Sequence, residues 1–596
     1  MRKPFVRLAV EQIEERVVPT LALDPAFGVG GANVVPINDY ELATQFFGLA
    51  VTPGDGFVAG GIARVRDEFY GRSAKTVVVK YTPDGKYDTS FGTGGFKNVS
   101  FLSGDQNYEQ ALQSTGIVKI QTDGKIVVVA DIFLGKTSNS YRSYIGVARL
   151  NPEGSYDSTF GNNGRVVVDF DQINDPFQEE NTDTDVDELL RSVFVTEAGT
   201  ITVGLGINYR ILRTDQQFLP VFELNNPALF QLTPSGTFDT SFGVNGKVVV
   251  PVSEVIYNEQ FSNFKVSTLQ GESAGAFSYK GWFFAPSPDG YRIAGNLRAN
   301  AYNFLKAGGI DWDSRILPSY TITSSIDKSG RLVEAFDGDG VKYFEFGTRM
   351  KDRDNSNDFI TGSLFVDEDG KTTVIGGRTD TGIGQLPVGS GFSLYRLLPN
   401  GQFDPAFGIN GISSNLTTVE NKSNTGVLTG PRQAILQSNG SSVFLSDFPL
   451  LLAGIAANGK QNTAFGTDGS YSPTNELGNL FPIDPRAVIA YGGPTIQAMA
   501  QDSKGRIILA GNLARNFLTG SNSFAFSGGL VARIIDVPLP PPVVPPVVPP
   551  VVPPVVLPVV LVPGSEPVVP PVVGPACPPV LPPVVGGGGG GGGGGL

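Results

Sequence analysis

The sequence contains no histidine and a single cysteine, Cys577, among its 596 residues. A chain without histidine has no Ser-His-Asp triad, no Cys-His pair and no histidine-ligated zinc or haem. One cysteine excludes an intramolecular disulfide, a thiolate zinc site and an iron–sulfur cluster. The sequence therefore lacks the residues on which the commonest hydrolytic and redox chemistries depend.

Basic residues are also in deficit. The 44 Lys and Arg are outnumbered by 57 Asp and Glu, which gives a formal net charge of −13. Because a nucleic-acid binder needs a basic surface that displaces phosphate counterions, this balance argues against a nucleic-acid partner. Glycine (76), proline (44) and phenylalanine (40) are abundant instead. Many turn residues combined with many β-forming residues indicate an all-β protein with tight turns.

An internal repeat organises most of the chain. Its anchor reads Tyr156-Asp-Ser-Thr-Phe-Gly161 in the third copy and is degraded to Val333-Glu-Ala-Phe-Asp337 in the fifth, with Glu334 for Asp and Asp337 for Gly. We interpret the anchor Asp as the cap of a turn and the anchor Phe as an aromatic plug between sheets. The anchor phenylalanines are 58 to 94 residues apart and number seven: Phe27, Phe91, Phe160, Phe242, Phe336, Phe407 and Phe465.

Four short β-rich segments accompany each anchor, and the middle two form a hairpin with a tight turn. In the third unit these segments are Gly164–Val168, Ser192–Val195, Thr200–Gly204 and Leu229–Leu232. Seven such units predict an all-β fold, a seven-bladed β-propeller of four-stranded blades, over residues 21–536.

The two ends of the repeat region complement each other. The seventh unit stops at Asp536 without a following anchor, whereas the chain begins with the extra anchor Leu23–Gly28. We therefore expect the N-terminal segment to pair with a strand near Gly529–Arg533. Such pairing closes the ring and removes the free sheet edges of a linear array.

The repeat resembles the bacterial delta-60 repeat, whose pattern combines D-x-x-F-G-x-x-G, Q-x-D-G-K-I-V-V-A-G and R-L-x-P-x-G. Residues Gln121–Ala130 and Arg149–Gly164 are the closest copies. The resemblance covers about residues 21–536 and is specific through the number of copies. It implies a propeller-like protein that is exported or associated with the cell surface, and it implies no catalytic residues.

Two further kinds of segment flank the predicted propeller. Residues 1–20 contain three glutamates that interrupt any apolar stretch, so they are not an ordinary signal peptide. They are either an export leader or a short amphipathic helix.

Residues 537–585 contain 20 prolines, which predict polyproline II and exclude a membrane-spanning helix. The poly-Gly residues 586–596 complete a disordered tail, expected to be a spacer, in which Cys577 is either an attachment thiol or incidental.

Long joins between strands are expected on one face of the ring, opposite the tight turns. The longest belong to the third and fourth units, so we place the candidate site there. Four residues of these joins are tentative ligand-binding residues for a glycan: Tyr209, Arg210, Tyr302 and Trp312. Packing of aromatic residues within the loops is the alternative explanation.

The joins also suggest a tentative calcium site. Residues 169–188 contain nine carboxylates and no Lys or Arg. Within them Asp183, Asp185 and Asp187 alternate in a way that suits hard Ca²⁺, although the run does not match an EF-hand loop. Asp352 and Asp354 form a weaker version of the pattern. The alternative is a solvated acidic loop without a bound ion.

These observations favour a non-enzymatic binding or scaffolding module, extracellular or located at the cell surface or envelope. Its ligand is expected to be a protein or a glycan bound on the long-loop face. The alternative is a carbohydrate-active hydrolase or lyase that uses carboxylates. The two are distinguished by whether Asp, Glu, Tyr and Arg side chains converge at the centre of the ring.

Overall fold

The computed structural model describes residues 20–35, 41–65, 73–102, 112–113, 116–134, 142–170, 182–213, 220–252, 274–275, 277–299, 319–345, 358–379, 392–416, 433–447, 450–480, 490–491, 494–519 and 522–537. The chain divides into a compact unit, residues 1–539, and a second unit, residues 540–596. The expected leader at 1–19 and the Pro/Gly-rich tail with Cys577 lie outside the described residues.

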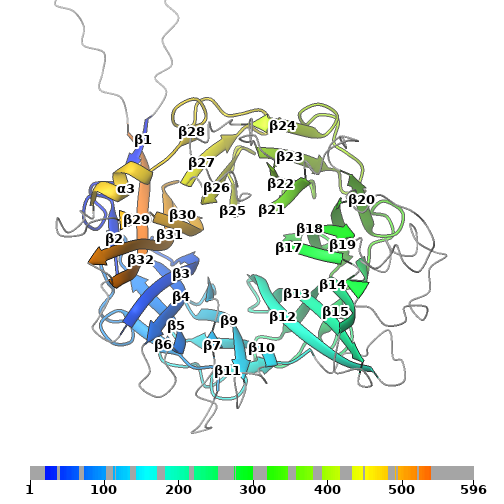
Figure 1. The fold of residues 1–596 in the computed structure, drawn as a ribbon, viewed down its shortest axis with the longest axis horizontal. Helices are drawn as coiled ribbons and strands as arrows, with labels where there is room; N and C mark the ends of the chain where they lie inside the picture. Colours follow the sequence, from blue (N-terminus) through cyan, green and yellow to red (C-terminus); the bar gives the residue numbers. More distant parts are fainter. Residues whose placement is uncertain are drawn as a thin grey trace, which may run out of the picture. The chain divides into compact units, whose positions relative to one another are not determined.

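Seven four-stranded antiparallel blades surround a central axis, as predicted (Figure 1). From the axis outward, the first blade consists of β3 (Glu41–Val51), β4 (Phe57–Val65), β5 (Ser73–Tyr81) and β6 (Phe96–Val99). The second consists of β8 (Ile117–Ile120) with the short β7 (Leu112–Gln113), β9 (Ile126–Leu134), β10 (Arg142–Leu150) and β11 (Arg165–Val168). The third consists of β12 (Thr182–Val195), β13 (Ile201–Arg213), β14 (Pro220–Leu232) and β15 (Lys247–Val249), with β16 (Ala274–Gly275) parallel to β14.

The remaining blades follow in chain order. The fourth is β17 (Phe277–Ser287), β18 (Gly290–Ala299), β19 (Ser319–Asp327) and β20 (Val341–Glu345), and the fifth is β21 (Asp358–Val366), β22 (Thr372–Thr379), β23 (Phe392–Leu397) and β24 (Ile412–Leu416). The sixth is β25 (Gln433–Leu436), β26 (Ser442–Asp447), β27 (Leu450–Ile455) and β28 (Ser470–Tyr471). The seventh is β30 (Pro494–Gln501), β31 (Ile507–Thr519) with β29 (Ala490–Tyr491), β32 (Asn522–Val537), and the N-terminal β1 (Thr20–Leu23) and β2 (Ala32–Val34).

Each repeat unit is offset by one strand from a blade. The first strand after an anchor is the outermost strand of the preceding blade, and the next three strands begin the following blade. The seventh blade therefore takes its outer strand from the N-terminus: Ala32 pairs with Ala532, and Leu23 pairs with Ile534. The predicted closure of the ring is confirmed. We refer to the pairing of β1 and β2 with β32 as the closing seam.

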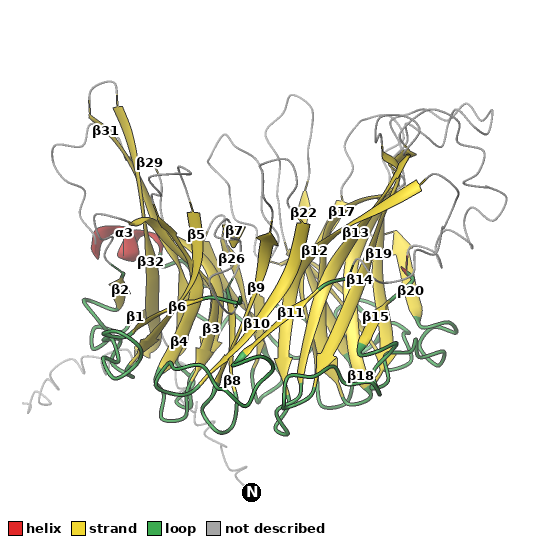
Figure 2. Cartoon of the chain, turned by 90° about the horizontal axis from the view of Figure 1, so that it is seen from below, coloured by secondary structure: helices red, strands yellow, loops and turns green. Residues whose placement is uncertain are grey.

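Tight turns lie together at one end of the strands (Figure 2). Part of the expected long joins is strand instead of loop. β12 begins at Thr182, and β13 and β14 leave only residues 214–219 between them. The charge of the acidic run predicts a loop, and the structure corrects this prediction. However, its alternating β-branched residues Thr182, Thr184 and Val186 favour extended backbone that pairs with β13.

The anchors are the turns that connect each third strand to its outer strand. The anchor Asp caps its own turn, as predicted, because one carboxylate oxygen accepts the N–H two residues ahead; in the second blade this bond runs from Thr159 to Asp157 at 3.0 Å. The anchor phenylalanines are almost completely buried in six blades, and Phe465 is half-buried. The aromatic plug is therefore confirmed as a packing element between blades.

One hydrogen bond joins successive blades at these anchors. The N–H of the residue after the anchor Phe donates to a carbonyl in the corresponding turn of the next blade. This bond measures 2.8–3.0 Å at six junctions: Gly28 to Asp84, Gly92 to Glu153, Gly161 to Ser235, Gly243 to Ser329, Asp337 to Asn400 and Gly408 to Asn458. At the seventh junction the corresponding turn would follow β32, whose last residue is Val537. There α3 (Thr474–Leu480) contributes Glu476, whose carboxylate accepts the Leu23 N–H at 3.3 Å.

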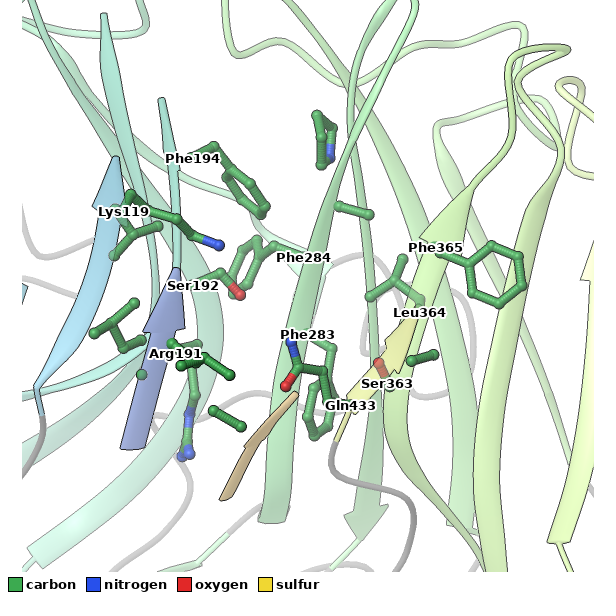
Figure 3. A pocket seen from close by; sticks show the side chains of 18 of the residues that line it. Lys119, Arg191, Ser192, Phe194, Phe283, Phe284, Ser363, Leu364, Phe365 and Gln433 are labelled. Atoms are coloured by element: carbon green, nitrogen blue, oxygen red, sulfur yellow. The ribbon is translucent and has the colours of Figure 1, made fainter. Parts of the chain in front are cut away.

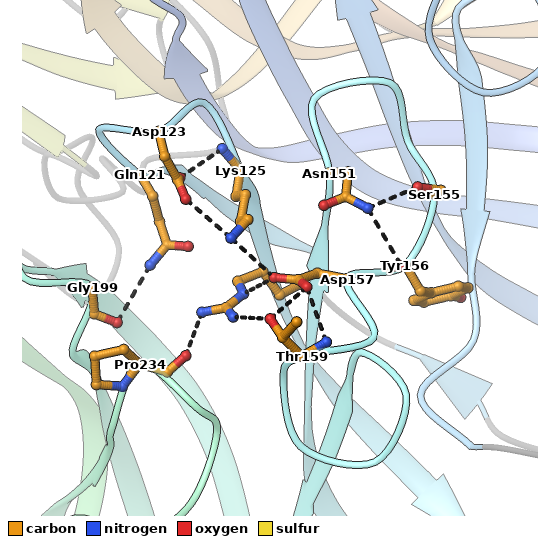
Figure 4. Close-up of polar contacts among 11 residues, drawn as sticks. Gln121, Asp123, Lys125, Asn151, Ser155, Tyr156, Asp157, Thr159, Gly199 and Pro234 are labelled. Carbon is orange, nitrogen blue, oxygen red and sulfur yellow. Dashed lines mark hydrogen bonds and ion pairs between the residues drawn. The ribbon is translucent and has the colours of Figure 1, made fainter.

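A buried arginine reinforces the anchor in several blades. In the second blade Arg149 lies over the Phe160 ring at 4.6 Å. Its Nε donates to Asp157 at 2.8 Å, and its guanidinium also donates to the Pro234 carbonyl of the third blade at 2.6 Å; Figure 4 labels these two acceptor residues. Burial alone would raise the pKa of Asp157. The hydrogen bonds from Thr159 and the charge of Arg149 outweigh this effect and lower the pKa to about 2. We call this arrangement the arginine clamp.

The fifth anchor requires a correction. Spacing from Phe336 places Val333, and not Glu334, at the position of the anchor Asp, because the Phe336 N–H donates to the Val333 carbonyl as the Phe160 N–H does to Asp157. The turn geometry is nevertheless retained: Asp337 adopts φ of 56°, the same left-handed value as Gly243 in the fourth anchor. Aspartate tolerates this conformation better than most residues.

The fourth blade, which carries this anchor, has no arginine at the clamp position, and an arginine of a different strand takes its place. Its clamp position is Ser325, which cannot form an ion pair. Arg292 of β18 instead donates to the Ser325 hydroxyl at 2.6 Å and lies 5.3 Å from the Phe336 ring centroid. Arg292 is buried and forms an ion pair with Asp289 at 2.9 Å. A guanidinium group is thus kept beside the anchor Phe even though it comes from a neighbouring strand.

The clamp also holds the closing seam. Arg533 of β32 donates to Asp24 at 2.8 Å, lies over Phe27 at 4.7 Å and donates to the Pro83 carbonyl of the first blade. We predict that Arg533→Met lowers the free energy of unfolding by about 3–5 kcal/mol, because it leaves the buried Asp24 carboxylate unpaired. Amide hydrogen exchange should show that Ala32–Val34 then exchange selectively faster.

Arg396→Met is the matched control. Arg396 forms the same clamp with Asp404 and Phe407 inside the ring, so its loss should destabilise the protein to a similar extent. It should not selectively accelerate exchange in β2. Equal exchange of β2 in the two variants would show that Arg533 has no special part in closure.

Candidate functional site

An axial cavity of about 390 Å³ lies within the ring (Figure 3). The innermost strands of all seven blades line it, through β3, β8, β12, β17, β21, β25 and β30. The lining residues come from the part of each strand that leads into a tight turn. Lys119, for example, lies two residues before Gln121, whose N–H closes the turn by donating to the Lys125 carbonyl at 2.9 Å.

Bulges in the inner strands shape this cavity. The register shifts by one residue in β3, β12, β21 and β30, and the extra residues of three of these strands, Phe47, Arg191 and Gln497, line the cavity. A bulge leaves a residue outside the regular ladder and re-aims its neighbours. The preceding blade stabilises two of these irregular positions: Asp131 accepts the Leu190 N–H at 2.6 Å, and Asn296 accepts the Thr361 N–H at 2.6 Å.

Lys119 brings a positive charge into the cavity. Its ammonium group points into the space beside Phe194 and Ser192 (Figure 3). The side chain keeps some contact with solvent, but the surrounding blades displace most of the water near its end. This burial lowers the pKa of Lys119 below its ordinary value of 10.5, and no carboxylate counteracts the shift. Within the described part of the chain, no ion pair or hydrogen bond of the Lys119 ammonium is found.

Gln433 presents hydrogen-bond donors to the same cavity. Its side-chain oxygen accepts the Met499 N–H at 2.5 Å, which fixes the orientation of the amide. An amide oriented in this way leaves its NH₂ group for another partner. Ser192 and Ser363 add hydroxyl groups, and Arg191 adds a second positive charge. The polar lining is therefore rich in donors.

Among the described residues that line this cavity there is no carboxylate and no tyrosine. Two buried acidic residues lie in the second and third blades, but their carboxylates accept hydrogen bonds from backbone N–H groups and from a side-chain hydroxyl. Glu188 is fully buried and accepts the Phe170 N–H at 3.0 Å and the Ser143 hydroxyl. Asp131 accepts the Leu190 N–H, as described above. Their contacts are those of groups that stabilise the junction between the second and third blades.

The residues predicted from sequence are placed as follows. Tyr209 and Arg210 lie in β13, where they pair with Val186 and Asp185 of β12, but their side chains are outside the description. Tyr302, Trp312, Asp352 and Asp354 lie outside the described residues. Asp183, Asp185 and Asp187 are part of β12 and do not form a loop. The ligand-binding role of the first four stays a prediction.

Comparison with known families gives one match. Residues 121–160 match a family described as "Domain of unknown function (DUF5122) beta-propeller". The match covers the turn after β8, the strands β9 and β10, and the anchor as far as Phe160 in the second blade, and it agrees with the propeller architecture. No curated protein matches the chain.

Several solved structures share a distant likeness. The Hadza microbial sialidase Hz136 is 12% identical, with a TM-score of 0.33, over 68% of this chain and 64% of its own. The polysaccharide lyase Uly1 is 11% identical, with a TM-score of 0.40, over 83% of this chain and 90% of its own. An alpha-L-arabinanase from Penicillium chrysogenum is 10% identical, with a TM-score of 0.31, over 72% and 94%. The chain thus spans less than two thirds of the sialidase, and likeness this low carries no functional argument.

The metal-binding prediction now concerns a strand. Extended backbone separates alternate residues by about 6.6 Å, which hinders convergence of three successive carboxylates on one ion. Among side chains that the structure describes, no group of three acidic residues is placed to hold a metal. If Asp183, Asp185 and Asp187 bind Ca²⁺, millimolar Ca²⁺ should raise Tm relative to a chelator, and Asp185→Asn should abolish the increase. Identical Tm values with Ca²⁺ and chelator would contradict the site.

The environment of Lys119 predicts an effect on stability. The folded protein penalises its ammonium form, so Lys119→Met should raise Tm at pH 7 by about a degree. Because the pKa is lowered on folding, the penalty is fully present below the folded pKa. It disappears as the pH rises to the ordinary value of 10.5. Between pH 6 and pH 10.5, the difference in Tm between Lys119→Met and the parent protein should become smaller. Lys460→Met, at an exposed position, should show no such trend. A Tm of Lys119→Met below that of the parent protein would contradict this account.

Proposed function

We propose that the protein is a binding module of the cell envelope or extracellular space, that its ligand is a glycan or protein, and that it does not cleave that ligand. The observation that carries this proposal is the lining of the axial cavity. All seven blades contribute to it, and its described residues supply hydrogen-bond donors and apolar groups but no carboxylate. Most ligand sites combine an apolar concave surface with a few polar groups that fix orientation.

The alternative, a carboxylate-based hydrolase or lyase, is less well supported. Glycoside hydrolysis generally requires two carboxyl groups about 5–10 Å apart on either side of the scissile bond. The described lining offers Lys119 and Arg191 but no such pair. The proposed location rests on the resemblance of the repeat to exported proteins and on the composition of residues 1–20. No helix in the described part of the chain is long and apolar enough to cross a membrane.

The test combines binding with product analysis. The full-length protein is applied to a glycan array, and every bound glycan is incubated with it and then analysed for cleavage. Ser192→Trp, which fills the cavity, should weaken binding at least tenfold. Ser235→Trp, at an exposed tight turn, should have no effect and serves as the control. Cleavage above the rate in buffer, or full binding by Ser192→Trp, would refute the proposal.

A further inference from the structure

Lys119 stands at a position that is apolar in the five other units that share its tight turn. The tight turn after the inner strand is closed by the same backbone hydrogen bond in six blades, so positions can be compared by counting back from it. Two residues before that turn, Lys119 in the second blade corresponds to Ala50, Phe194, Phe365, Ile435 and Ala500. An internal comparison of the repeats therefore singles out this lysine.

A structural role does not account for it. A lysine that stabilised the ring would be paired with a carboxylate, as Lys80 is with Asp88 at 3.1 Å. Instead, the described residues around Lys119 offer no counter-charge, and burial disfavours its charged form. An uncompensated ammonium group in a cavity attracts an anion, and the anion would remove the penalty. The chain as a whole has a formal net charge of −13, whereas the charged residues in the described lining of the cavity, Lys119 and Arg191, are both basic.

The neighbours of Lys119 suit an oxyanion. Ser192 lies beside it, and the Gln433 amide, held by the Met499 N–H, directs its NH₂ group toward the cavity from another blade (Figure 3). An ammonium, a hydroxyl and an amide NH₂ group are all donors, and donors to a carboxylate form stronger, charge-assisted hydrogen bonds. A neutral ligand would not use the ammonium charge to the same extent.

The remaining lining indicates the kind of molecule that bears the anion. Phe194 lies in the same space beside Lys119 (Figure 3). The ring of Phe284 is buried against Gly204 of the third blade, and Phe365 packs against the core between the fifth and sixth blades. A pyranose ring has apolar C–H faces that pack on aromatic rings and a polar edge that accepts hydrogen bonds. The cavity volume of about 390 Å³ lies within the range of small-ligand sites and exceeds the needs of a bare inorganic ion.

We propose that the axial cavity binds the carboxylate of an acidic sugar, with Lys119 as the counter-charge, Ser192 and Gln433 as further donors, and the Phe194 ring against a sugar face. This inference rests on the proposed binding function and narrows its ligand to acidic glycans. It assigns Lys119 as a specificity-determining residue: a sugar of the same size without the carboxylate gains no charge-assisted contact.

The test uses sodium glucuronate as the probe and the full-length protein in calorimetric titrations at constant ionic strength. Glucuronate should bind at least tenfold more tightly than glucose. Lys119→Gln should weaken glucuronate binding by tenfold or more, because it removes the positive charge that assists the hydrogen bond to the carboxylate, and should weaken glucose binding by a much smaller factor. Lys460→Gln makes the same change in net charge at an exposed turn and should bind glucuronate like the parent protein.

Other probes decide between sources of the anion. Sodium sulfate and N-acetylglutamate, which represent an inorganic ion and an acidic protein side chain, should each bind at least tenfold more weakly than glucuronate. Equal binding of either would overturn the sugar assignment, and so would an unchanged affinity of Lys119→Gln. If neutral glycans bind on the array and Ser192→Trp abolishes that binding, the proposed function stands although the acidic-sugar inference fails. Thermal unfolding should first confirm that the Lys119→Met variant is folded. If this folded variant still binds glucuronate as tightly as the parent protein, the acidic-sugar inference is likewise overturned.

Discussion

The hydrogen bond between each anchor and the next blade is the constraint on which the ring depends. At six junctions the residue whose N–H makes this bond directly follows the anchor Phe and is left-handed, with φ between 51° and 56°. The buried Phe fills the space between the blades, and the Asp cap keeps the turn in place. Repetition of this contact sets the spacing of the blades and thereby the width of the axial cavity.

The arginine clamp shows that the chemistry of a junction matters more than its sequence. Arg149, Arg396 and Arg533 are equivalent in position, Lys80 replaces them in the first blade, and Arg292 reaches the fourth anchor from another strand. In each case a cation lies near the ring of an anchor Phe and donates hydrogen bonds beside it. A junction can therefore lose its Asp, as at Val333, and still retain a cation–π contact.

Local features could be predicted from the sequence, and long-range ones could not. Asp-x-x-Phe-Gly anchors determine turns through residues a few positions apart, so the repeat number, the propeller and the closing seam followed from them. The acidic segment of β12 was misjudged because its charge was weighed above its alternating β-branched residues. The assignment of Glu334 failed because the hydrogen bond depends on the spacing from Phe336. Lys119 was overlooked because only the closed ring brings seven separate inner strands to one axis.

The register of the closing seam also determines how the ring responds to force. Thr20 pairs with Val537, so both ends of the ring meet at one point. Because β1 and β32 are antiparallel, a pull on these two residues in opposite directions loads the hydrogen bonds one after another, as in unzipping, instead of all together in shear. The buried Asp24–Arg533 ion pair is among the first strong contacts that such peeling reaches. The mechanical strength of the ring is thus set by a few bonds near its ends and not by its total number of strand pairs.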